Sequence, residues 1–330
     1  MKLFRALPLH FSLAVTLCGL ACTLADSAFA QGSAYPSKPI TIVVAYPPGG
    51  STDLTGRTLA TELSARLGVP VVIDNVGGAG GAIGAQKVAH AVPDGYTLLV
   101  GASNELAINK LVTSTVKYEQ KDFTPIGLIA SQPLVLVASP KAGVKNTEEF
   151  INAVQKNPGK FSYGSSGVGT SLHLAGEMVK QQAGLFMTHI PYRGVAPLTN
   201  DLVGNNLDFG VFVLSSGLSH IRSGRVIALG TTEAKRSVAM PDIPALAENP
   251  KLKGLDIGVW FALMGPAKLP EPVIAKLKQA LGDALQSPDF RKKMEASSST
   301  VAAPGVDLAK FLVTETAKYK RIVDFAHIKE

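Results

Sequence analysis

Two short segments of the chain combine glycines with hydroxyl side chains directly before an expected helix. The first is Pro48-Gly49-Gly50-Ser51-Thr52, and the second runs from Ser165 to Thr170. Glycine lets backbone N–H groups approach a ligand, and the first turn of a helix offers unpaired N–H donors and a partial positive charge. Two such segments facing each other across a cleft would bind the carboxylate groups of a small acid. Two ordinary glycine-rich turns would have the same composition, so the residues alone leave both interpretations open.

The glycines do not form a nucleotide-binding motif. In the segment Gly78–Gly84, Ile83 stands where G-x-G-x-x-G requires its third glycine. Gly49 and Gly50 occupy the first strand-to-helix turn, where that motif belongs, and they lack the pattern. The chain also has no G-x-x-x-x-G-K-[ST] sequence. We therefore expect no nucleotide, and the residues imply no other cofactor.

Patterns typical of catalysis or metal binding are also missing from the sequence. The residues around Ser166 lack the second glycine of the G-x-S-x-G hydrolase turn, and no histidine pair has metal-ligand spacing. His173, one turn into the helix that follows the second segment, is a possible ligand contact. A role in packing between domains, or in hydrogen bonding to a loop carbonyl, is the interpretation that we favour for it. We expect neither an enzyme nor a metal site.

Strands and helices alternate around these segments. Asp53 is expected to cap the first helix, whose apolar face would include Leu54, Leu59, Leu63 and Leu67. Strand–helix–strand order predicts α/β folding with parallel strands and right-handed crossovers. The last two helices are expected to pack on the first domain. Strands are predicted at residues 40–45, 69–74, 96–100, 134–138, 161–164, 188–191, 207–214 and 226–230, and helices at 53–67, after 81, at 146–157, at 171–182, around 274–285 and around 308–323.

Length and composition indicate a folded protein of about two domains. The chain has 330 residues, of which 46% are hydrophobic and 17% are charged, and this excludes a disordered protein. Its formal net charge is +7, but the basic residues are scattered, with Arg291-Lys292-Lys293 the longest consecutive run. We expect no nucleic-acid partner, while a mild positive charge favours small anions.

Residues 1–30 have the three-part layout of a secretory signal peptide. Basic residues are followed by the uncharged apolar stretch Phe11–Leu24 and then by the small-x-small site Ala28-Phe29-Ala30. The apolar stretch is shorter than the ~20 residues that a membrane anchor needs. We therefore expect cleavage after Ala30 and a periplasmic protein.

Both cysteines of the chain, Cys18 and Cys22, lie in this leader. The mature chain would then contain no disulfide, no cysteine-bound metal and no catalytic thiol. A lipoprotein anchored at Cys22 is the alternative, although Gly19 stands where a lipobox has leucine.

Beyond single motifs, an ordered set of residues resembles the Bug (Bordetella uptake gene) family of extracytoplasmic solute receptors, also called the tripartite tricarboxylate receptor family. The resemblance covers nearly all of the mature chain. It rests on Pro47–Asp53, Asn75 with Gly77–Gly81, Pro93–Tyr96, Asp122–Ile126, Pro158–Lys160, Gly167–Thr170 with His173-Leu174, Pro191–Gly194, and Trp260.

The resemblance implies a type II periplasmic-binding-protein fold, with two α/β lobes, a two-crossover hinge and a ligand cleft. We expect residues 34–131 plus 256–330 to form one lobe and 132–255 the other. In the family, the first strand–helix loop and the second-lobe Ser/Gly loop hold a ligand carboxylate, partly through waters. The expected ligand-binding residues are Pro48, Gly49, Gly50, Ser51, Thr52, Asp53, Ser103, Ser165, Ser166, Gly167, Gly169, Thr170 and His173.

The resemblance also implies a function. We expect a monomeric receptor that closes on a small organic carboxylate and delivers it to a membrane transporter of the tripartite tricarboxylate type. Many relatives have an acidic residue where this chain has Leu214, which disfavours a ligand with an ammonium group. A sensory receptor for the same ligands and an enzyme that processes a small acid remain alternatives. The identity of the carboxylate lies beyond the sequence.

Overall fold

The computed structural model describes residues 35–237 and 240–329. The expected signal peptide, its cleavage site and Cys22 lie outside the described residues. The chain divides into two compact units, Met1–Ser37 and Lys38–Glu330. Residues 35–37, the described part of the first unit, contain no helix or strand. None of the described helices is long and apolar enough to cross a membrane.

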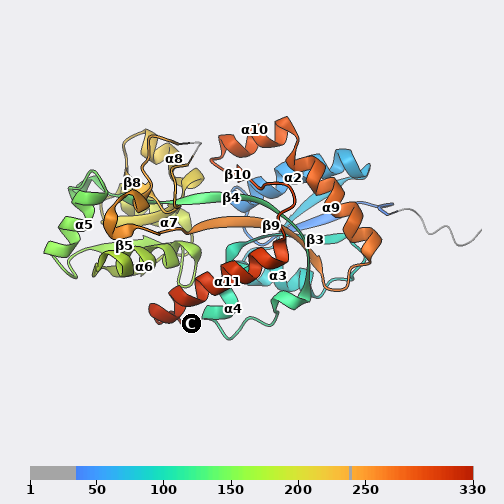
Figure 1. The fold of residues 1–330 in the computed structure, drawn as a ribbon, viewed down its shortest axis with the longest axis horizontal. Coiled ribbons are helices and arrows are strands. Elements are labelled where there is room, and N and C mark those ends of the chain that lie inside the picture. Colours follow the sequence, from blue (N-terminus) through green and yellow to red (C-terminus); the bar gives the residue numbers. More distant parts are fainter. Residues whose placement is uncertain (1–34, 238–239, 330) are drawn as a thin grey trace, which may run out of the picture. The chain divides into compact units, whose positions relative to one another are not determined.

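Ten strands in the described part of Lys38–Glu330 pair in the order β2-β1-β3-β9-β4-β7-β5-β6, with β8 and β10 also paired to β4 (Figure 1). β1 runs parallel to β2 and β3, and β5 runs parallel to β6 and β7, whereas β4 and β9 are antiparallel to their neighbours. The strands are β1 (Ile40–Val44), β2 (Val71–Asn75), β3 (Thr97–Ala102), β4 (Phe123–Ala138), β5 (Ser162–Ser165), β6 (Thr188–Pro191), β7 (Phe209–Val213), β8 (Ile227–Thr231), β9 (Gly258–Pro266) and β10 (Thr300–Val301).

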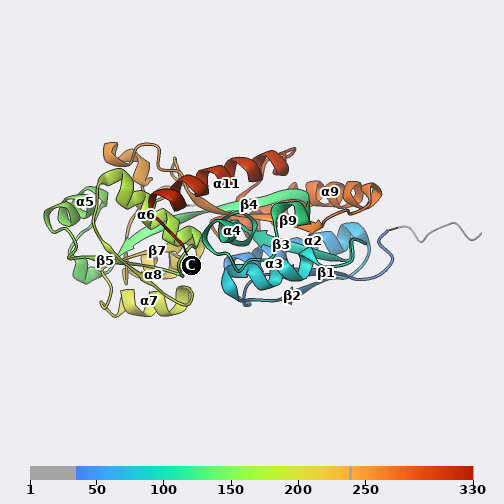
Figure 2. The same cartoon turned by 90° about the horizontal axis from the view of Figure 1, so that it is seen from below.

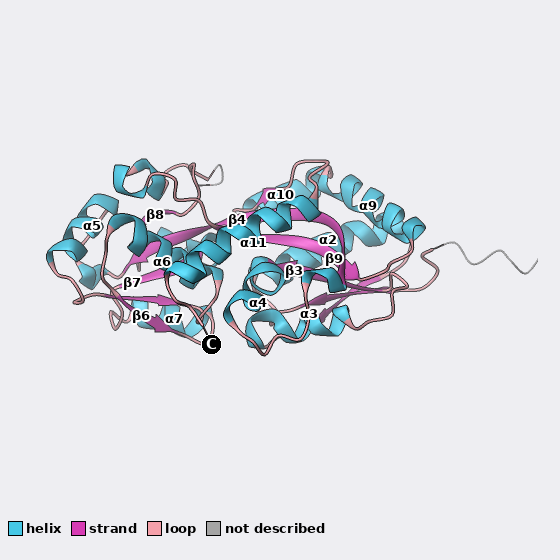
Figure 3. Ribbon diagram, turned by 60° about the horizontal axis from the view of Figure 1, so that its bottom comes forward, coloured by secondary structure: helices cyan, strands magenta, loops and turns pink. Residues whose placement is uncertain are grey.

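Helices cover the strands on both faces (Figure 3). A π-helical turn, Asn104–Ile108, follows β3 directly. The α-helices are α2 (Ser51–Leu67), α3 (Ala82–Ala89), α4 (Asn109–Val112), α5 (Thr147–Lys156), α6 (Ser171–Ala183), α7 (Val195–Val203), α8 (Leu214–Arg222), α9 (Glu271–Leu285), α10 (Pro288–Ala296) and α11 (Leu308–Phe325).

The apolar residues of β1 lie in the core. Ile40, Ile42, Val43 and Val44 of β1 are completely buried, as expected for a central parallel strand with helices on both faces. The β1–α2–β2 connection leads from β1 to its neighbour on one side. The β2–α3–β3 connection leads back past β1 to its neighbour on the other side, and so runs in the opposite direction along the sheet. Right-handed crossovers therefore place α2 and α3 on opposite faces of the strands.

β4 belongs to both halves of the strand arrangement. Its first part pairs with β9 as far as Pro133, which lies opposite Gly258. From Leu134 onwards it pairs instead with β7 and β8. Proline has no N–H to donate to a strand ladder, so it is tolerated where the pairing partner changes. Pro133 therefore marks the point at which one strand passes from one set of partners to the other.

The structure confirms the predicted alternation of strands and helices and corrects its extent. The strand predicted at 134–138 is the second part of the 16-residue β4. Several elements were not expected from the sequence, namely β9, β10, α4, α7, α8 and α10. Leu54 was assigned to the apolar face of its helix, but 42% of it is exposed, whereas Leu59 and Leu63 are fully buried.

The two predicted C-terminal helices pack differently from one another. As expected, α9 packs against the first helix, α2, and against β4. The last helix, α11, runs along β4 and contacts both the π-helical turn after β3 and α6 (Figure 2). The expectation that both helices pack on the first domain is therefore incomplete for α11.

Two helical glycines provide a matched test of this packing. A Cβ atom on Gly176 in α6 would lie 2.2 Å from the ring of Tyr163, which is fully buried, whereas a Cβ on Gly282 in α9 would meet nothing within 4 Å. We expect Gly176→Ala to lower the free energy of unfolding by roughly 1–3 kcal/mol through overpacking. Gly282→Ala should raise it by about 0.5–1 kcal/mol, because alanine is the better helix former. Urea denaturation followed by circular dichroism measures both changes, and a stable Gly176→Ala protein would contradict this account of the core.

Candidate functional site

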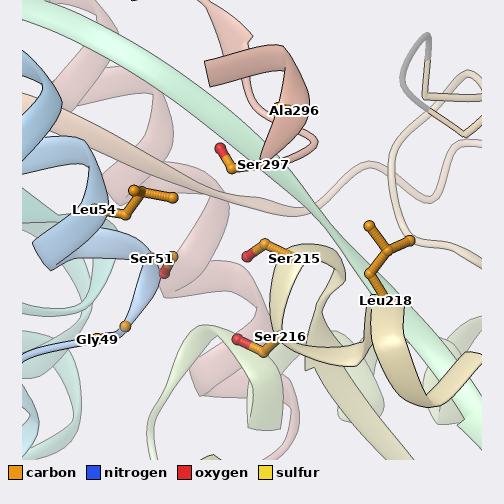
Figure 4. A pocket seen from close by; sticks show the side chains of 9 residues that line it. Gly49, Ser51, Leu54, Ser215, Ser216, Leu218, Ala296 and Ser297 are labelled. Carbon is orange, nitrogen blue, oxygen red and sulfur yellow. The ribbon is translucent and has the colours of Figure 1, made fainter. Parts of the chain in front are cut away.

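The start of α2, the start of α8 and the end of α10 surround a pocket of about 200 Å³ (Figure 4). No charged side chain contributes to its lining. Four of the lining residues are serines, and the Ser215 and Ser216 hydroxyls point toward the start of α2. The residues that line it are Gly49, Gly50, Ser51, Leu54, Ser215, Ser216, Leu218, Ala296 and Ser297.

Two helices begin at this pocket, and neither has a side-chain cap. The N-cap residues are Gly50 for α2 and Val213 for α8, and neither makes a side-chain hydrogen bond to the first turn. The first N–H groups of a helix have no partner within the helix, and they attract anions. Among the described residues, the Ser51 and Ser216 hydroxyls also have no hydrogen-bond partner. The pocket therefore offers several neutral donors to one ligand.

Asp53 was expected at the N-cap, and this prediction is wrong. It occupies the third position of α2, where it is 4% exposed. Its carboxylate accepts hydrogen bonds from the Gly49 N–H at 2.9 Å, from Asn75 at 2.9 Å and from Arg57 at 3.0 Å. The N-cap residue is Gly50, which has no side chain, and the Asp53 carboxylate three residues later bonds back to the loop before the helix. Asp53 thereby fixes Gly49 while its charge is occupied away from the pocket lining.

These contacts keep Asp53 ionised. Burial by itself would raise the pKa of the carboxyl, but the hydrogen bonds from Arg57, Gly49 and Asn75 together lower the pKa below its usual value. Asn75 also donates to the Tyr46 carbonyl at 3.0 Å. The loop between β1 and α2 is thus held at both of its ends by one polar network.

A second buried acid lies behind the same loop. The Tyr46 hydroxyl donates to Glu105 at 2.6 Å, and the Ala102 N–H donates to the other oxygen of that carboxyl at 2.6 Å. Burial raises the pKa of Glu105 to about 7, although these hydrogen bonds oppose the rise. Glu105 does not line the pocket between α2 and α8. Its contacts instead connect β1 and the π-helical turn after β3.

Gln132 connects two walls of the pocket from behind. It lies in β4, is completely buried and accepts a hydrogen bond from the Ser215 hydroxyl at 3.0 Å. Its amide N–H₂ donates to the Ser299 hydroxyl at 2.6 Å and to the Ser297 carbonyl at 3.3 Å. Breaking any of these hydrogen bonds would leave a buried polar group without a partner, which is costly. Gln132 therefore holds the start of α8 and the segment after α10 in fixed positions relative to β4.

The Ser165–Thr170 segment has its own hydrogen bonds. Thr170 caps α6 by accepting from the His173 N–H at 3.3 Å, and its hydroxyl donates to the Gly167 carbonyl at 2.9 Å. The fully buried Ser165 hydroxyl lies 3.0 Å from the same carbonyl. The polar atoms of Ser165 and Thr170 are thus engaged within the loop, while Ser166 and Gly167 are partly exposed.

His173 holds this loop rather than projecting from it. Its Nδ1 accepts the Gly169 N–H at 3.1 Å. Of the two expected roles, packing between domains or hydrogen bonding to a loop carbonyl, the second is corrected, because the loop partner is an N–H group. The ring stacks on His189 with centroids 3.8 Å apart, and His189 Nε2 lies 2.8 Å from the Ser165 hydroxyl. Burial lowers the pKa of His173 to about 4 and that of His189 to about 3. Both rings are therefore neutral near pH 7, as the accepting Nδ1 requires.

The predicted site residues fall into three groups. Gly49, Gly50 and Ser51 line the pocket, and Pro48, Thr52 and Asp53 flank them. Ser103 is completely buried at the end of β3, next to Asn104, whose side chain accepts the Ser171 N–H at 2.9 Å. The segment with Ser165, Ser166, Gly167, Gly169 and Thr170, together with His173, forms the start of α6 and does not line this pocket.

Sequence analysis did not identify Ser215, Ser216 or Ser297 as site residues. A signal for the first two was present, because one residue after β7 the chain reads Ser215-Ser216-Gly217, a run of small and hydroxyl residues like those of the two other segments, here within the first turn of α8. Ser297 had no such signal, since its position depends on the pairing of β10 with β4. Within the described residues, no group of three His, Cys, Asp or Glu side chains is placed to hold a metal ion.

The histidine stack predicts a dependence of stability on pH. Both histidines have folded-state pKa values below the unfolded value of about 6.5, so the unfolded chain binds more protons between pH 6.5 and 4. The contribution of these two histidines to stability should therefore be fully present above about pH 6.5 and be lost on acidification, by at most about 1.4 kcal/mol per pH unit for each histidine. His173→Gln keeps an acceptor for Gly169 without titrating, and its stability should fall less steeply. Urea titrations from pH 7.5 to 4.5 compare the two proteins, and parallel curves would contradict the assignment.

Comparison with known proteins identifies the family of the chain. The sequence profile of the tripartite tricarboxylate transporter family receptor matches residues 55–327. Protein BugT of Bordetella pertussis (strain Tohama I) is 33% identical over 294 residues, covering 88% of this chain and 89% of the relative.

Solved structures show the same fold. The periplasmic binding protein BugD is 32% identical with a TM-score of 0.79, covering 89% of this chain and 99% of that chain. An R. palustris protein with adipate is 29% identical with a TM-score of 0.83, covering 89% and 99%. MatC from Rhodopseudomonas palustris with bound malate is 29% identical with a TM-score of 0.78, covering 88% and 100%. The fold is the two-lobed α/β fold of periplasmic binding proteins, and the chain belongs to the tripartite tricarboxylate transporter receptor family, which includes the Bug proteins.

Proposed function

We propose that the chain is a periplasmic receptor for a small organic carboxylate, which it binds in the pocket between α2 and α8. The observation that carries the proposal is the convergence of two uncapped helix starts on one serine-lined pocket without a charged side chain. Free N–H groups and hydroxyls at helix starts bind carboxylates well. Relatives of the same fold contain adipate and malate, which are carboxylates.

The other predicted residues have a place in this proposal. The Ser165–Thr170 segment, with Ser103 and His173, would complete the site when the protein closes around its ligand. Closure would occur between lobes formed by residues 34–131 plus 256–330 and by 132–255. The connections between these lobes are β4 and the segment between β8 and β9. The receptor would act as a monomer and deliver its ligand to an inner-membrane transporter of the tripartite tricarboxylate type.

Two serines of α8 test the neutral-donor site. Ser216 lines the pocket, and the exposed Ser219 on the same helix does not. We expect Ser216→Ala to weaken carboxylate binding by roughly 1–3 kcal/mol, or about 5- to 150-fold in Kd, because a ligand oxygen loses its partner. Ser219→Ala should change Kd by less than about twofold. Titration calorimetry, with an acid that a thermal-shift screen of mono-, di- and tricarboxylates has identified, measures both.

Arg193 provides the contrasting variant. It is exposed beside the Ser165–Thr170 segment and has no ion pair with another described residue. If neutral donors anchor the carboxylate, Arg193→Gln should weaken binding by less than Ser216→Ala does, and added salt should have little effect in a desolvated site. Loss of binding in Arg193→Gln alone, together with a steep salt dependence, would show that a cation is the anchor.

The proposed location has its own test. Cleavage after Ala30 would give a mature chain that begins at Gln31, or at its cyclised form. Intact-mass measurement of protein released from the periplasm should therefore show a chain without residues 1–30. A lipid adduct at Cys22, or a full-length protein in the cytosol, would contradict the proposal.

A further inference from the structure

The pocket has an apolar part that the carboxylate site does not use. Leu54, Leu218 and Ala296 contribute to the lining alongside the serines and glycines. Leu54 is 42% exposed, although its neighbours on α2 at the core face are buried. A large apolar side chain that remains exposed inside a pocket is a surface that a ligand can cover, and covering it is favourable.

The same arrangement occurs on both helices. On α2, Ser51 is followed three residues later by Leu54, and on α8 Ser215 is followed three residues later by Leu218. Residues three apart lie on the same face of a helix, one turn further along. Each helix therefore presents a hydroxyl at its start and a leucine directly behind it. Figure 4 shows Leu54 extending from α2 into the space that Ser215 faces from α8.

This apolar part offers a ligand few hydrogen-bond partners. The side chains of Leu54, Leu218 and Ala296 contain no polar atom. The Ser215 hydroxyl already donates to Gln132, and the Ser297 hydroxyl already donates to the Met294 carbonyl. A hydroxyl group of a ligand in this part of the pocket would lose its water and gain no replacement. A methylene group in the same place would instead gain about fourfold in Kd.

We propose that the pocket selects carboxylates with an unsubstituted alkyl or aromatic skeleton over hydroxylated acids of the same charge. Leu54 and Leu218 are the residues that determine this selectivity. The inference rests on the proposed function, because it concerns the part of the ligand that lies behind the carboxylate group.

Matched acids that differ by one hydroxyl group test the selectivity. The pairs are butanoate with 3-hydroxybutanoate, succinate with malate, and tricarballylate with citrate, so that one pair matches each possible ligand charge. We expect the member without the hydroxyl to bind about 10- to 100-fold more tightly, which is the range in which an apolar pocket rejects an added hydroxyl. Titration calorimetry on the wild-type protein measures this ratio.

Two variants assign the selectivity to the leucine side chain. Leu54→Asn should reduce the ratio within a binding pair by about fivefold or more, because the amide gives the hydroxyl a partner. Val313→Asn is the matched control, since Val313 is 66% exposed on α11 and does not line the pocket, and it should leave the ratio within about twofold. Circular dichroism confirms that each variant is folded.

The outcomes separate this inference from the proposed function. If none of the six acids binds, the proposed carboxylate site and this inference both fail. If the hydroxylated member of a pair binds more tightly, the receptor function stands and the selectivity is wrong. A ratio that Leu54→Asn and Val313→Asn leave equally unchanged also overturns the role of Leu54.

Discussion

One strand, β4, has to satisfy two sets of partners, and the position of the pocket depends on this constraint. The start of α8 follows β7, which pairs with the second part of β4. The segment after α10 leads into β10, which pairs with the first part at Ser131. Between these two pairings lies Gln132, whose side chain binds serines of both segments. The two walls therefore come from distant parts of the chain, but both are held by adjacent residues of β4.

The site is organised so that charges support the pocket without entering it. The Asp53 carboxylate accepts hydrogen bonds from the Gly49 N–H, from Asn75 and from Arg57. The two stacked histidines are held neutral by burial, and one of them accepts a backbone N–H of the Ser165–Thr170 segment. In both arrangements, ionisable side chains hold loops in position. The groups left to bind a ligand are N–H groups and hydroxyls, and these side chains determine where they lie.

Local sequence was sufficient to predict the first α/β elements and the part of the site that they carry. Alternating apolar runs and glycines predicted β1, α2 and the loop with Gly49, Gly50 and Ser51, because each of these depends on neighbouring residues. The other wall was not predictable in this way. Ser297 enters the pocket only because β10 pairs with β4, and no window of sequence contains that tertiary pairing. Leu54 is a different case, because it lies five residues before Leu59 and therefore about 140° around the helix from it. Its exposure was thus readable from the helix period, which the assignment of all four leucines to one face overlooked.

The strand order has a consequence for the order in which the molecule folds. In the sheet, β9 (residues 258–266) lies between β3 and β4, although both of these strands precede it in the chain by more than a hundred residues. The strands paired with the second part of β4 come instead from an uninterrupted stretch that ends at Thr231. A chain delivered from its N-terminus can complete the latter group first, whereas β3 and the first part of β4 keep open edges until β9 arrives. Open strand edges can associate with other chains, so β9 removes two such edges when it pairs with β3 and β4.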